Sequence, residues 1–327
     1  MTKRAVVLFN LGGPDEPESV KPFLFNLFYD PAIISLPNPL RYLLARLISS
    51  RREKEASEIY RELGGGSPLL KNTKDQAKAL KELLPSEDRV FIAMRYWAPR
   101  AAETVRAVQE FDPDEVVLLP LYPQLSGTTT GSSYNEWQRE ASRLKLEKPT
   151  RFICCYPAHE GVTKGYASLI KPFITKRKSR AFRLLFSAHG LPESKVRSGD
   201  PYPRQIRETV DGILSYLPKN IDSVVCYQSR VGPVKWIGPE TEAEIEKAAK
   251  EGVGVVLIPV AFVSEHSETL VELDVEYKEI ADRLGVPFYD RVPALGIQPD
   301  FIRALSNLVT KPRPCYQCEE GCVWRDL

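Results

Sequence analysis

The sequence lacks an apolar run long enough to cross a bilayer: the longest nearly apolar stretch, Val253–Val263, is about half of the ~20 residues that a transmembrane helix needs. It also lacks a charge bias, because 45 Lys and Arg stand against 43 Asp and Glu and leave a net charge of +2. This balance gives no indication of a nucleic-acid partner. The first residues enter an apolar strand directly, without a secretory signal, so we expect a cytoplasmic protein with reduced thiols.

The common nucleotide-binding and hydrolase motifs are also missing. Three loops are rich in small residues, 11–14, 64–68 and 128–133, but none has the spacing of a P-loop or of a complete dinucleotide fingerprint. The sequence contains neither the nucleophile elbow of an esterase nor the H-E-x-x-H helix of a zinc protease. These loops are therefore interpreted as turns whose backbone N–H groups could still approach an anion such as a carboxylate.

Short apolar runs alternate with amphipathic segments along nearly the whole chain, which predicts an α/β fold with parallel sheets covered on both faces. The expected strands are 4–11, 89–96, 115–122, 151–157, 182–188, 223–229, 253–263 and 287–292. Eight strands exceed the five or six of a typical sheet. Two domains of about four strands each, divided near residues 150–160, are therefore favoured. A single (β/α)₈ barrel is the alternative, but the strands are too unevenly spaced for it.

Residues 22–48 interrupt this alternation. The segment is richer in apolar residues than the 43% average, is broken by Pro31, Pro37 and Pro39, and is bordered by arginines. It has two interpretations: a helical subdomain packed on the core, or an exposed apolar lip over a pocket that touches a membrane surface through its basic rim.

Two of the only three histidines follow apolar strands. His189 ends the run 182–188 and His266 follows the run 253–263, and ligands of open α/β sheets bind outside the carboxyl ends of the strands. These two are therefore interpreted as functional, whereas His159 is interpreted as structural.

An acidic series follows His266. On an α-helix at 100° per residue, one face would carry Glu265, Glu268, Glu272, Glu276 and Glu279. A solvated helix face is the alternative, but like charges at this spacing repel and no Lys or Arg lies within the stripe. Carboxylates next to an imidazole suit Fe²⁺ or the transfer of protons.

Seven motifs in chain order resemble the ferrochelatase family. They are Phe-Asn-Leu-Gly-Gly-Pro (9–14), Tyr-Arg-Glu-Leu-Gly-Gly-Gly-Ser-Pro (60–68), Met-Arg-Tyr (94–96), Leu-Tyr-Pro-Gln (121–124) with Thr-Thr-Gly-Ser-Ser (129–133), Phe-Ser-Ala-His-Gly-Leu-Pro (186–192), Tyr-Gln-Ser-Arg-Val-Gly-Pro (227–233) and the acidic series from 265 to 277. The resemblance implies a lyase of haem biosynthesis that inserts Fe²⁺ into a porphyrin without a redox cofactor. It also implies a class II chelatase fold: two Rossmann-like domains, each with a mainly parallel four-stranded sheet flanked by helices, and a cleft between them.

The resemblance divides the chain and assigns roles by position. It implies an N-terminal domain over 1–155 with the lip at 22–48, a C-terminal domain over 156–295, and a helix and cysteine-rich tail over 296–327 that returns to the N-terminal domain. His189 and Glu268 would bind the metal and accept protons, and Glu272 and Glu276 would continue the acidic path. The porphyrin-binding positions are Tyr60, Ser67, Arg95, Tyr96, Ser132 and Trp236.

The tail holds three thiols within eight residues, Cys315, Cys318 and Cys322, which favours metal binding over inert cysteines. A [2Fe–2S] cluster takes four thiolates, so a fourth must come from Cys154, Cys155 or Cys226. Some ferrochelatases look the same, and this resemblance indicates Cys155, with Cys154 as its rival. A Cys₄ zinc site is the alternative.

The expected substrates are protoporphyrin IX and Fe²⁺, with haem b and two protons as products. Four propionates would favour a more cationic pocket, so coproporphyrin III is the second choice. A cobalt or nickel chelatase and a tetrapyrrole carrier without catalysis are further alternatives, although a carrier would need neither the His189–Glu268 pair nor the acidic series. We expect a monomer or homodimer with peripheral contact to the inner membrane through residues 22–48.

Overall fold

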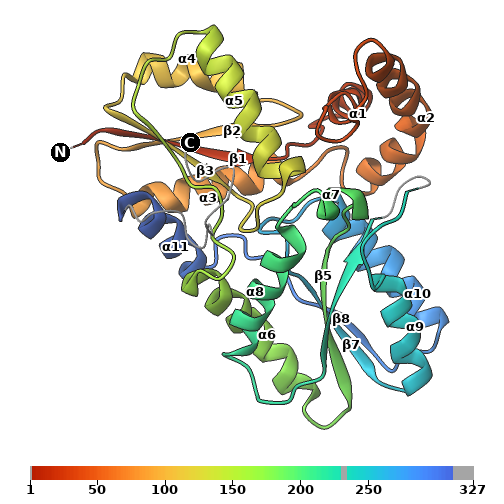
Figure 1. The fold of residues 1–327 in the computed structure, drawn as a ribbon. Helices are drawn as coiled ribbons and strands as arrows, with labels where there is room; N and C mark the ends of the chain where they lie inside the picture. The colour runs from red at the N-terminus through yellow and green to blue at the C-terminus, as the bar shows by residue number, and fades with distance from the viewer. Residues whose placement is uncertain (1, 230–233, 312–327) are drawn as a thin grey trace. The chain divides into compact units, whose positions relative to one another are not determined.

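The computed structural model describes residues 2–229 and 234–311, which form two compact units. The first unit takes the chain up to Cys155 and the segment that begins at Leu305, and the second unit is Tyr156–Ala304. Each unit contains one four-stranded sheet in which all strands are parallel, with the order β2-β1-β3-β4 in the first and β6-β5-β7-β8 in the second. The predicted fold class is therefore confirmed, and a single eight-stranded barrel is excluded (Figure 1).

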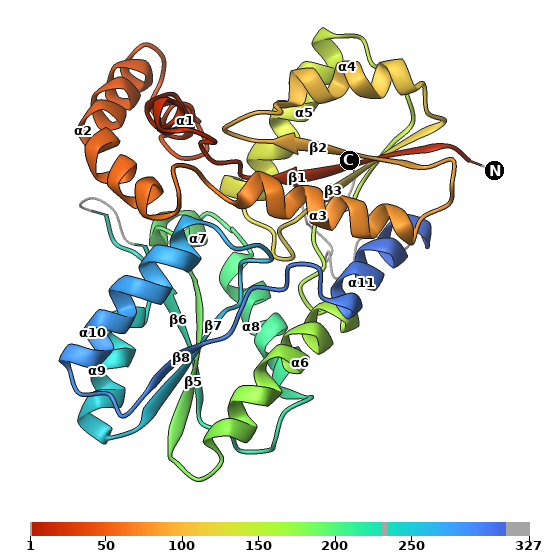
Figure 2. The same cartoon turned by 180° about the vertical axis from the view of Figure 1, so that it is seen from behind.

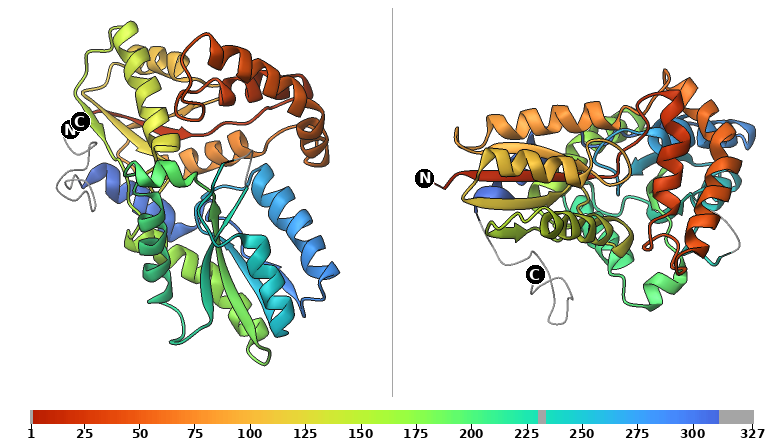
Figure 3. Two further views of the ribbon diagram at one scale, coloured as in Figure 1. Left: turned by 45° about the vertical axis from the view of Figure 1, so that its right-hand side comes forward. Right: turned by 90° about the horizontal axis from the view of Figure 1, so that it is seen from above.

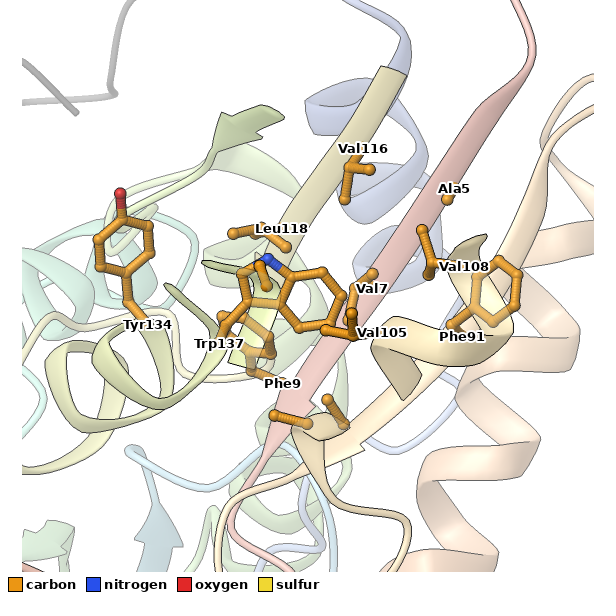
Figure 4. Packing of buried hydrophobic residues seen from close by; sticks show 13 residues of the cluster. Ala5, Val7, Phe9, Phe91, Val105, Val108, Val116, Leu118, Tyr134 and Trp137 are labelled. Atoms are coloured by element: carbon orange, nitrogen blue, oxygen red, sulfur yellow. The ribbon is translucent and has the colours of Figure 1, made fainter. Parts of the chain in front are cut away.

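The first sheet is built around a central strand that is buried on both faces. Its strands are β1 (Arg4–Asn10), β2 (Arg89–Met94), β3 (Glu115–Pro120) and β4 (Thr150–Phe152), and its flanking helices are α3 (Leu69–Glu82), α4 (Ala101–Phe111) and α5 (Ser132–Arg143). On the face covered by α4 and α5, Trp137 packs among Val7, Phe9 and Leu118 (Figure 4). The N-terminal strand is thus a core element, because its side chains pack on both sides.

Two helices, α1 (Val20–Phe28) and α2 (Leu40–Glu62), form a subdomain of the first unit over the predicted lip (Figure 3). Its inner side is packed, since Val20, Phe23 and Leu24 join Tyr60 and Tyr96 in one buried cluster. Its outer side exposes large apolar side chains: Ile33, Leu36, Leu40, Tyr42, Leu43 and Leu47. The segment therefore combines a packed subdomain with an exposed apolar surface.

The second unit has the same layered organisation (Figure 2). Its strands are β5 (Phe182–His189), β6 (Ser223–Gln228), β7 (Gly254–Pro259) and β8 (Tyr289–Arg291), and its helices include α6 (Glu160–Arg177), α7 (Glu193–Arg197), α8 (Tyr202–Leu214), α9 (Thr241–Glu251) and α10 (Tyr277–Arg283). Helix α11 (Pro299–Thr310) continues from this unit into the first one.

The segment after His266 differs from its prediction. It forms a π-helix, η3 (Glu268–Glu276), before α10 begins, instead of one continuous α-helix. A π-helix closes i→i+5 bonds, as in the bond from Tyr277 N to Glu272 O, and therefore turns its side chains differently from an α-helix. The glutamates of the predicted stripe have different surroundings: Glu265 is paired with Arg291, Glu268 faces His189, and Glu276 is exposed.

Candidate functional site

The carboxyl ends of the central strands of the second unit bring the functional side chains together. β5 ends at His189, which lies in register with Gln228 at the end of β6, and Ser187 lies in register with Pro259 at the end of β7. The chain after β7 leads through His266 into η3. This edge is where parallel α/β sheets bind their ligands.

His189 and Glu268 are in direct contact although they are far apart in the sequence. His189 Nδ1 lies 3.1 Å from Glu268 Oε2, and His266 Nε2 lies 3.8 Å from the same oxygen. The side chains of His189 and Glu268 are 43% and 30% exposed, whereas that of His266 is 9% exposed. The pair is therefore accessible from solvent, and His266 supports it from the protein side.

The protein environment shifts the pKa of each member of this pair. Desolvation lowers the pKa of His189, but the charge and the hydrogen bond of Glu268, together with the charge of Glu272, outweigh it and raise that pKa above its ordinary value. Desolvation raises the pKa of Glu268, but the two neighbouring imidazoles hold that pKa well below its ordinary range. Glu268 is thus a permanent anion, and His189 is a stronger base than a free imidazole.

Glu272 lies on η3 after Glu268, and its carboxylate accepts several hydrogen bonds. Ser229 donates from its backbone N at 3.0 Å and from Oγ at 2.5 Å, Gln228 Nε2 donates at 3.0 Å, and the Tyr277 hydroxyl donates at 3.0 Å. Burial and the charge of Glu268 raise the pKa of Glu272. A carboxylate of raised pKa can accept and release a proton near neutral pH more readily than an ordinary one.

Trp236 lies against the loop that carries His189. It forms an isolated bridge with Pro192, and its ring packs on Gly190, where an added Cβ would lie 3.1 Å from the ring and 2.8 Å from Gln228 O. Gly190 therefore allows the Trp236 ring to approach the backbone next to His189.

The first unit holds a second cluster, centred on a carboxylate that sequence reasoning missed. Asp30, 3% exposed, accepts hydrogen bonds from the Tyr96 hydroxyl at 2.7 Å and from Ser132 Oγ, and pairs with Arg95 Nη2 at 2.9 Å. Arg95 also donates to Glu136 at 2.9 Å and to Ser132 Oγ at 2.6 Å. Three predicted porphyrin-binding residues thus meet in one buried network.

The residues of this network are more deeply buried than residues that line an open surface would be. Tyr96 is 0% exposed, and the side chain of Arg95 is 10% exposed. Asp30 follows a helix and precedes a proline, so it had the appearance of an ordinary turn residue. The only signal in the sequence was that a buried Arg95 would need a carboxylate partner.

The other two predicted porphyrin-binding residues of the first unit lie nearby in its fold. Tyr60 is buried with Tyr96 in the cluster under α1. Ser67 lies against Gly13, where an added Cβ would come within 2.5 Å of Ser67, and its backbone N donates to Pro14 O at 2.7 Å. The motifs 9–14 and 60–68 are therefore in contact.

Three of the six cysteines lie within the described residues and three lie outside them. Cys154 and Cys155 are buried after β4, which ends at Phe152 and not at the predicted residue 157, with their Sγ atoms 3.7 Å apart. Cys226 is buried in β6, where burial raises the pKa of its thiol to about 12 and keeps it protonated. Cys315, Cys318 and Cys322 lie outside the described residues. Within the described ranges, no three His, Cys, Asp or Glu side chains form a group that could hold a metal ion.

Over residues 2–229 and 234–311, none of the helices is both long enough and apolar enough to span a bilayer.

The fold of two units, each with one parallel four-stranded sheet, is also the fold of solved chelatase structures. SirB from Bacillus subtilis shares this fold, with a TM-score of 0.60 at 12% identity over 94% of each chain. The sirohydrochlorin chelatase SirB from its subspecies spizizenii has a TM-score of 0.53 at 12% identity over 93% of each chain.

The ferrochelatase family profile matches residues 3–312. The ferrochelatase of Pelagibacter ubique is 52% identical, covering 94% of this chain and 91% of its own, and that of Caulobacter vibrioides is 52% identical, covering 99% and 94%. The chain belongs to the ferrochelatase family. The family inferred from the seven motifs is confirmed, and so is the enzyme class, a lyase that acts as a metal chelatase.

Proposed function

We propose that this protein inserts Fe²⁺ into protoporphyrin IX and releases two protons, with His189 and Glu268 at the point of metal entry. The observation that carries the proposal is the 3.1 Å contact between His189 Nδ1 and Glu268 Oε2 at the carboxyl ends of a parallel sheet. Fe²⁺ is a substrate here, and two protein ligands are enough because the porphyrin nitrogens supply the others.

The contact assigns separate tasks to the two imidazole nitrogens. Nδ1 faces Glu268, so in the neutral ring Nδ1 holds the proton and Nε2 keeps its lone pair. Nε2 then accepts a pyrrole proton from the porphyrin, and the anionic Glu268 stabilises the imidazolium that forms. A protonated His189 is therefore the product of proton transfer, which is consistent with its raised pKa.

Glu272 and Glu276 are the proposed route for that proton to solvent. Glu272 is partly buried with a raised pKa, and Glu276 is exposed at the end of η3. Because Glu276 is exposed, a proton that reaches it can pass directly to solvent.

The proposed porphyrin-binding residues are Tyr60, Ser67, Arg95, Tyr96, Ser132 and Trp236. Aromatic side chains hold a flat macrocycle by stacking and by burial of apolar area. Because Tyr96 is completely buried, its proposed task is to orient Arg95 and Ser132 through Asp30, and not to touch the ring.

The choice of protoporphyrin IX is supported by the pairing of the arginines near these residues. Arg95 is paired with Asp30 and Glu136, and Arg100 is paired with Glu136, so neither guanidinium is available to extra propionates without losing its partner. The test is anaerobic insertion of Fe²⁺ by the purified protein, run side by side with protoporphyrin IX and coproporphyrin III. Faster turnover of coproporphyrin III would contradict this choice, and failure with both would contradict the insertion activity.

The pH dependence of insertion follows from the His189–Glu268 pair. Insertion requires a deprotonated Nε2, and the pKa of His189 is raised, so the rate is expected to increase with pH to values above the ordinary pKa of about 6.5. Glu268→Gln removes the negative charge that raises this pKa, so the increase moves to lower pH while the maximal rate falls by about 10²- to 10⁴-fold. Rates measured from pH 5.5 to 9 check both effects, and an unmoved profile in the variant would contradict the coupling.

The proposed partner of the exposed lip surface is an anionic membrane, reached from the cytoplasm. Leu40, Leu43 and Leu47 are 56%, 59% and 47% exposed along one side of α2, and Arg46 and Arg51 lie on the same helix. Each basic residue near an anionic surface contributes about 1 kcal/mol of attraction. Liposome flotation at low salt is expected to recover part of the protein, and high salt to release it. The double variant Leu43→Ser/Leu47→Ser should give a lower recovered fraction than the wild type. Equal recovery would contradict the membrane contact and leave only the packed-subdomain interpretation.

We also propose that Cys155, Cys315, Cys318 and Cys322 bind a [2Fe–2S] cluster. Cys155 is buried just after β4, and Arg151 of β4 donates to Leu308 O at 3.1 Å and to Val309 O at 2.7 Å. These bonds hold the end of α11 beside the strand that leads to Cys155. The four chain steps from Lys311 to Cys315 span at most about 14 Å, and the proposed cluster requires the tail to reach Cys155.

Protein purified anaerobically is expected to be red-brown with about two irons and two sulfides per chain. Cys155→Ser should remove the colour and lower the melting temperature, because a cluster bound by the native state alone adds stability. Cys226→Ser is the control, and it should leave the colour unchanged. Colour retained in Cys155→Ser but lost in Cys154→Ser would move the fourth ligand to Cys154, and colourless protein with one zinc would indicate a Cys₄ site.

A further inference from the structure

The π-helix that carries Glu268 and Glu272 needs contacts that hold it in this form. It is nine residues long, whereas π-helical geometry usually appears as a single-turn bulge within an α-helix. Side chains from another element that bind defined residues along it can supply this restraint.

Arg291, at the end of β8, binds two carboxylates, one that precedes Glu268 in the sequence and one that follows it. Its Nη1 donates to Glu265 Oε1 at 2.6 Å, its Nε donates to Asp274 Oδ1 at 2.7 Å, and its Nη2 reaches Asp274 Oδ2. The Arg291 side chain is only 11% exposed. Charge-assisted bonds in the fork geometry of a guanidinium are strong and directional, so they fix both carboxylates at once.

Two further hydrogen bonds, from residues near Arg291 in the sequence, also restrain η3 and the segment before it. Ala294 N donates to Glu265 Oε1 at 2.9 Å, and the Tyr289 hydroxyl donates to Leu273 O at 2.7 Å. Tyr289 and Arg291 are alternate residues of β8 and therefore point to the same face of the sheet. Residues of the edge strand β8 thus bind η3 at Leu273 and Asp274. They also bind Glu265, which lies in the segment that precedes η3.

We infer that Arg291 is a positioning residue for the iron site, which rests on the function proposed above. Arg291 stands on β8, and β7 separates β8 from the β5 strand that carries His189. Its effect is therefore carried by η3: with Glu265 and Asp274 held, Glu268 stays directed at His189. Without the guanidinium, Glu265 and Asp274 lose their ion pairs with Arg291. The η3 segment is then free to rewind as an α-helix, which rotates Glu268 and Glu272 away from their partners.

The test compares Arg291→Met with Arg183→Met in the full-length protein. Arg183 is a matched control, because its side chain is also 11% exposed and pairs with two acids, Asp222 and Glu251, but it lies at the opposite end of β5 from His189. Co²⁺ binding is titrated by its visible absorption, and the signal that remains in His189→Ala is subtracted. Insertion rates measured at a series of porphyrin concentrations give kcat and the KM for porphyrin.

Arg291→Met is expected to weaken the His189-dependent Co²⁺ binding by about 10- to 100-fold and to lower kcat by a similar factor, with KM for porphyrin within about threefold. Arg183→Met should leave all three values within about twofold, even if both variants lose the same amount of thermal stability. Arg291→Lys keeps the charge without the fork, so it should give an intermediate loss, and it replaces Arg291→Met if that variant does not fold.

Wild-type Co²⁺ affinity and kcat in Arg291→Met, or equal losses in the Arg291 and Arg183 variants, would overturn the inference while the proposed function stands. Wild-type protein that neither binds Co²⁺ through His189 nor inserts iron would overturn the proposed function and this inference with it.

Discussion

Replacement of His189 by alanine is expected to abolish measurable iron insertion. The change removes the nitrogen that is proposed to accept pyrrole protons and one of the two proposed protein ligands for Fe²⁺. A positioned acid–base group alone contributes about 10²- to 10⁴-fold. Binding of porphyrin should stay within about tenfold of the wild-type value, since area burial by aromatic side chains holds the ring. Single-turnover insertion measures the first effect, and quenching of protein fluorescence by porphyrin measures the second.

His159→Ala is the matched control for this experiment. His159 precedes α6, where its Nδ1 accepts a hydrogen bond from Gly161 N at 3.1 Å. Loss of such a cap costs about 1 kcal/mol of stability, without a reason for a change in turnover. Near-normal kcat in His189→Ala would show that another group is the base.

Replacement of Asp30 by alanine is expected to lower the free energy of unfolding of the first unit by about 3–5 kcal/mol, which is the usual cost of breaking a buried ion pair from one side. Asp30 is 3% exposed and is the shared acceptor of Tyr96, Ser132 and Arg95, so the change removes one acceptor from three buried side chains at once. Urea unfolding followed by tryptophan fluorescence measures this loss, because Trp97 and Trp137 both lie in the first unit.

The comparison for this prediction is Asp75→Ala. Asp75 pairs with Lys71 at 3.2 Å, but the two side chains are 51% and 81% exposed. Solvent screens such a pair, and its loss should cost at most about 1 kcal/mol. Equal destabilisation in the two variants would contradict the central place of Asp30. Unchanged porphyrin binding in Asp30→Ala would show that Asp30 stabilises the first unit but does not orient Arg95 for porphyrin.

The central strands β1, β3, β5 and β7 were predictable because each is buried along most of its length and therefore appears as a short apolar run with turn residues at its ends. The π-helix was not, because carboxylates spaced four apart are equally compatible with an α-helix. The difference is made by Arg291 and Tyr289, whose hydrogen bonds to Glu265, Asp274 and Leu273 join segments that are separated in the sequence. Asp30 was missed for a similar reason, since its partners Arg95 and Ser132 lie 65 or more positions away.

By itself, the sequence determined the two-sheet α/β class and the family, because burial of strands and recurrent motifs are properties of neighbouring residues. It also predicted His189 and Glu268 as site residues. Only the tertiary structure decided which atoms meet: His189 Nδ1 with Glu268 Oε2, Glu272 with Ser229 and Tyr277, and Asp30 with Arg95. Such contacts depend on how the chain packs, since hydrogen bonds and ion pairs act over a few ångströms while their partners lie up to 79 residues apart. That distance is also why the direction of each pKa shift, and with it the proposed path of the protons, followed from the packing and not from residue types.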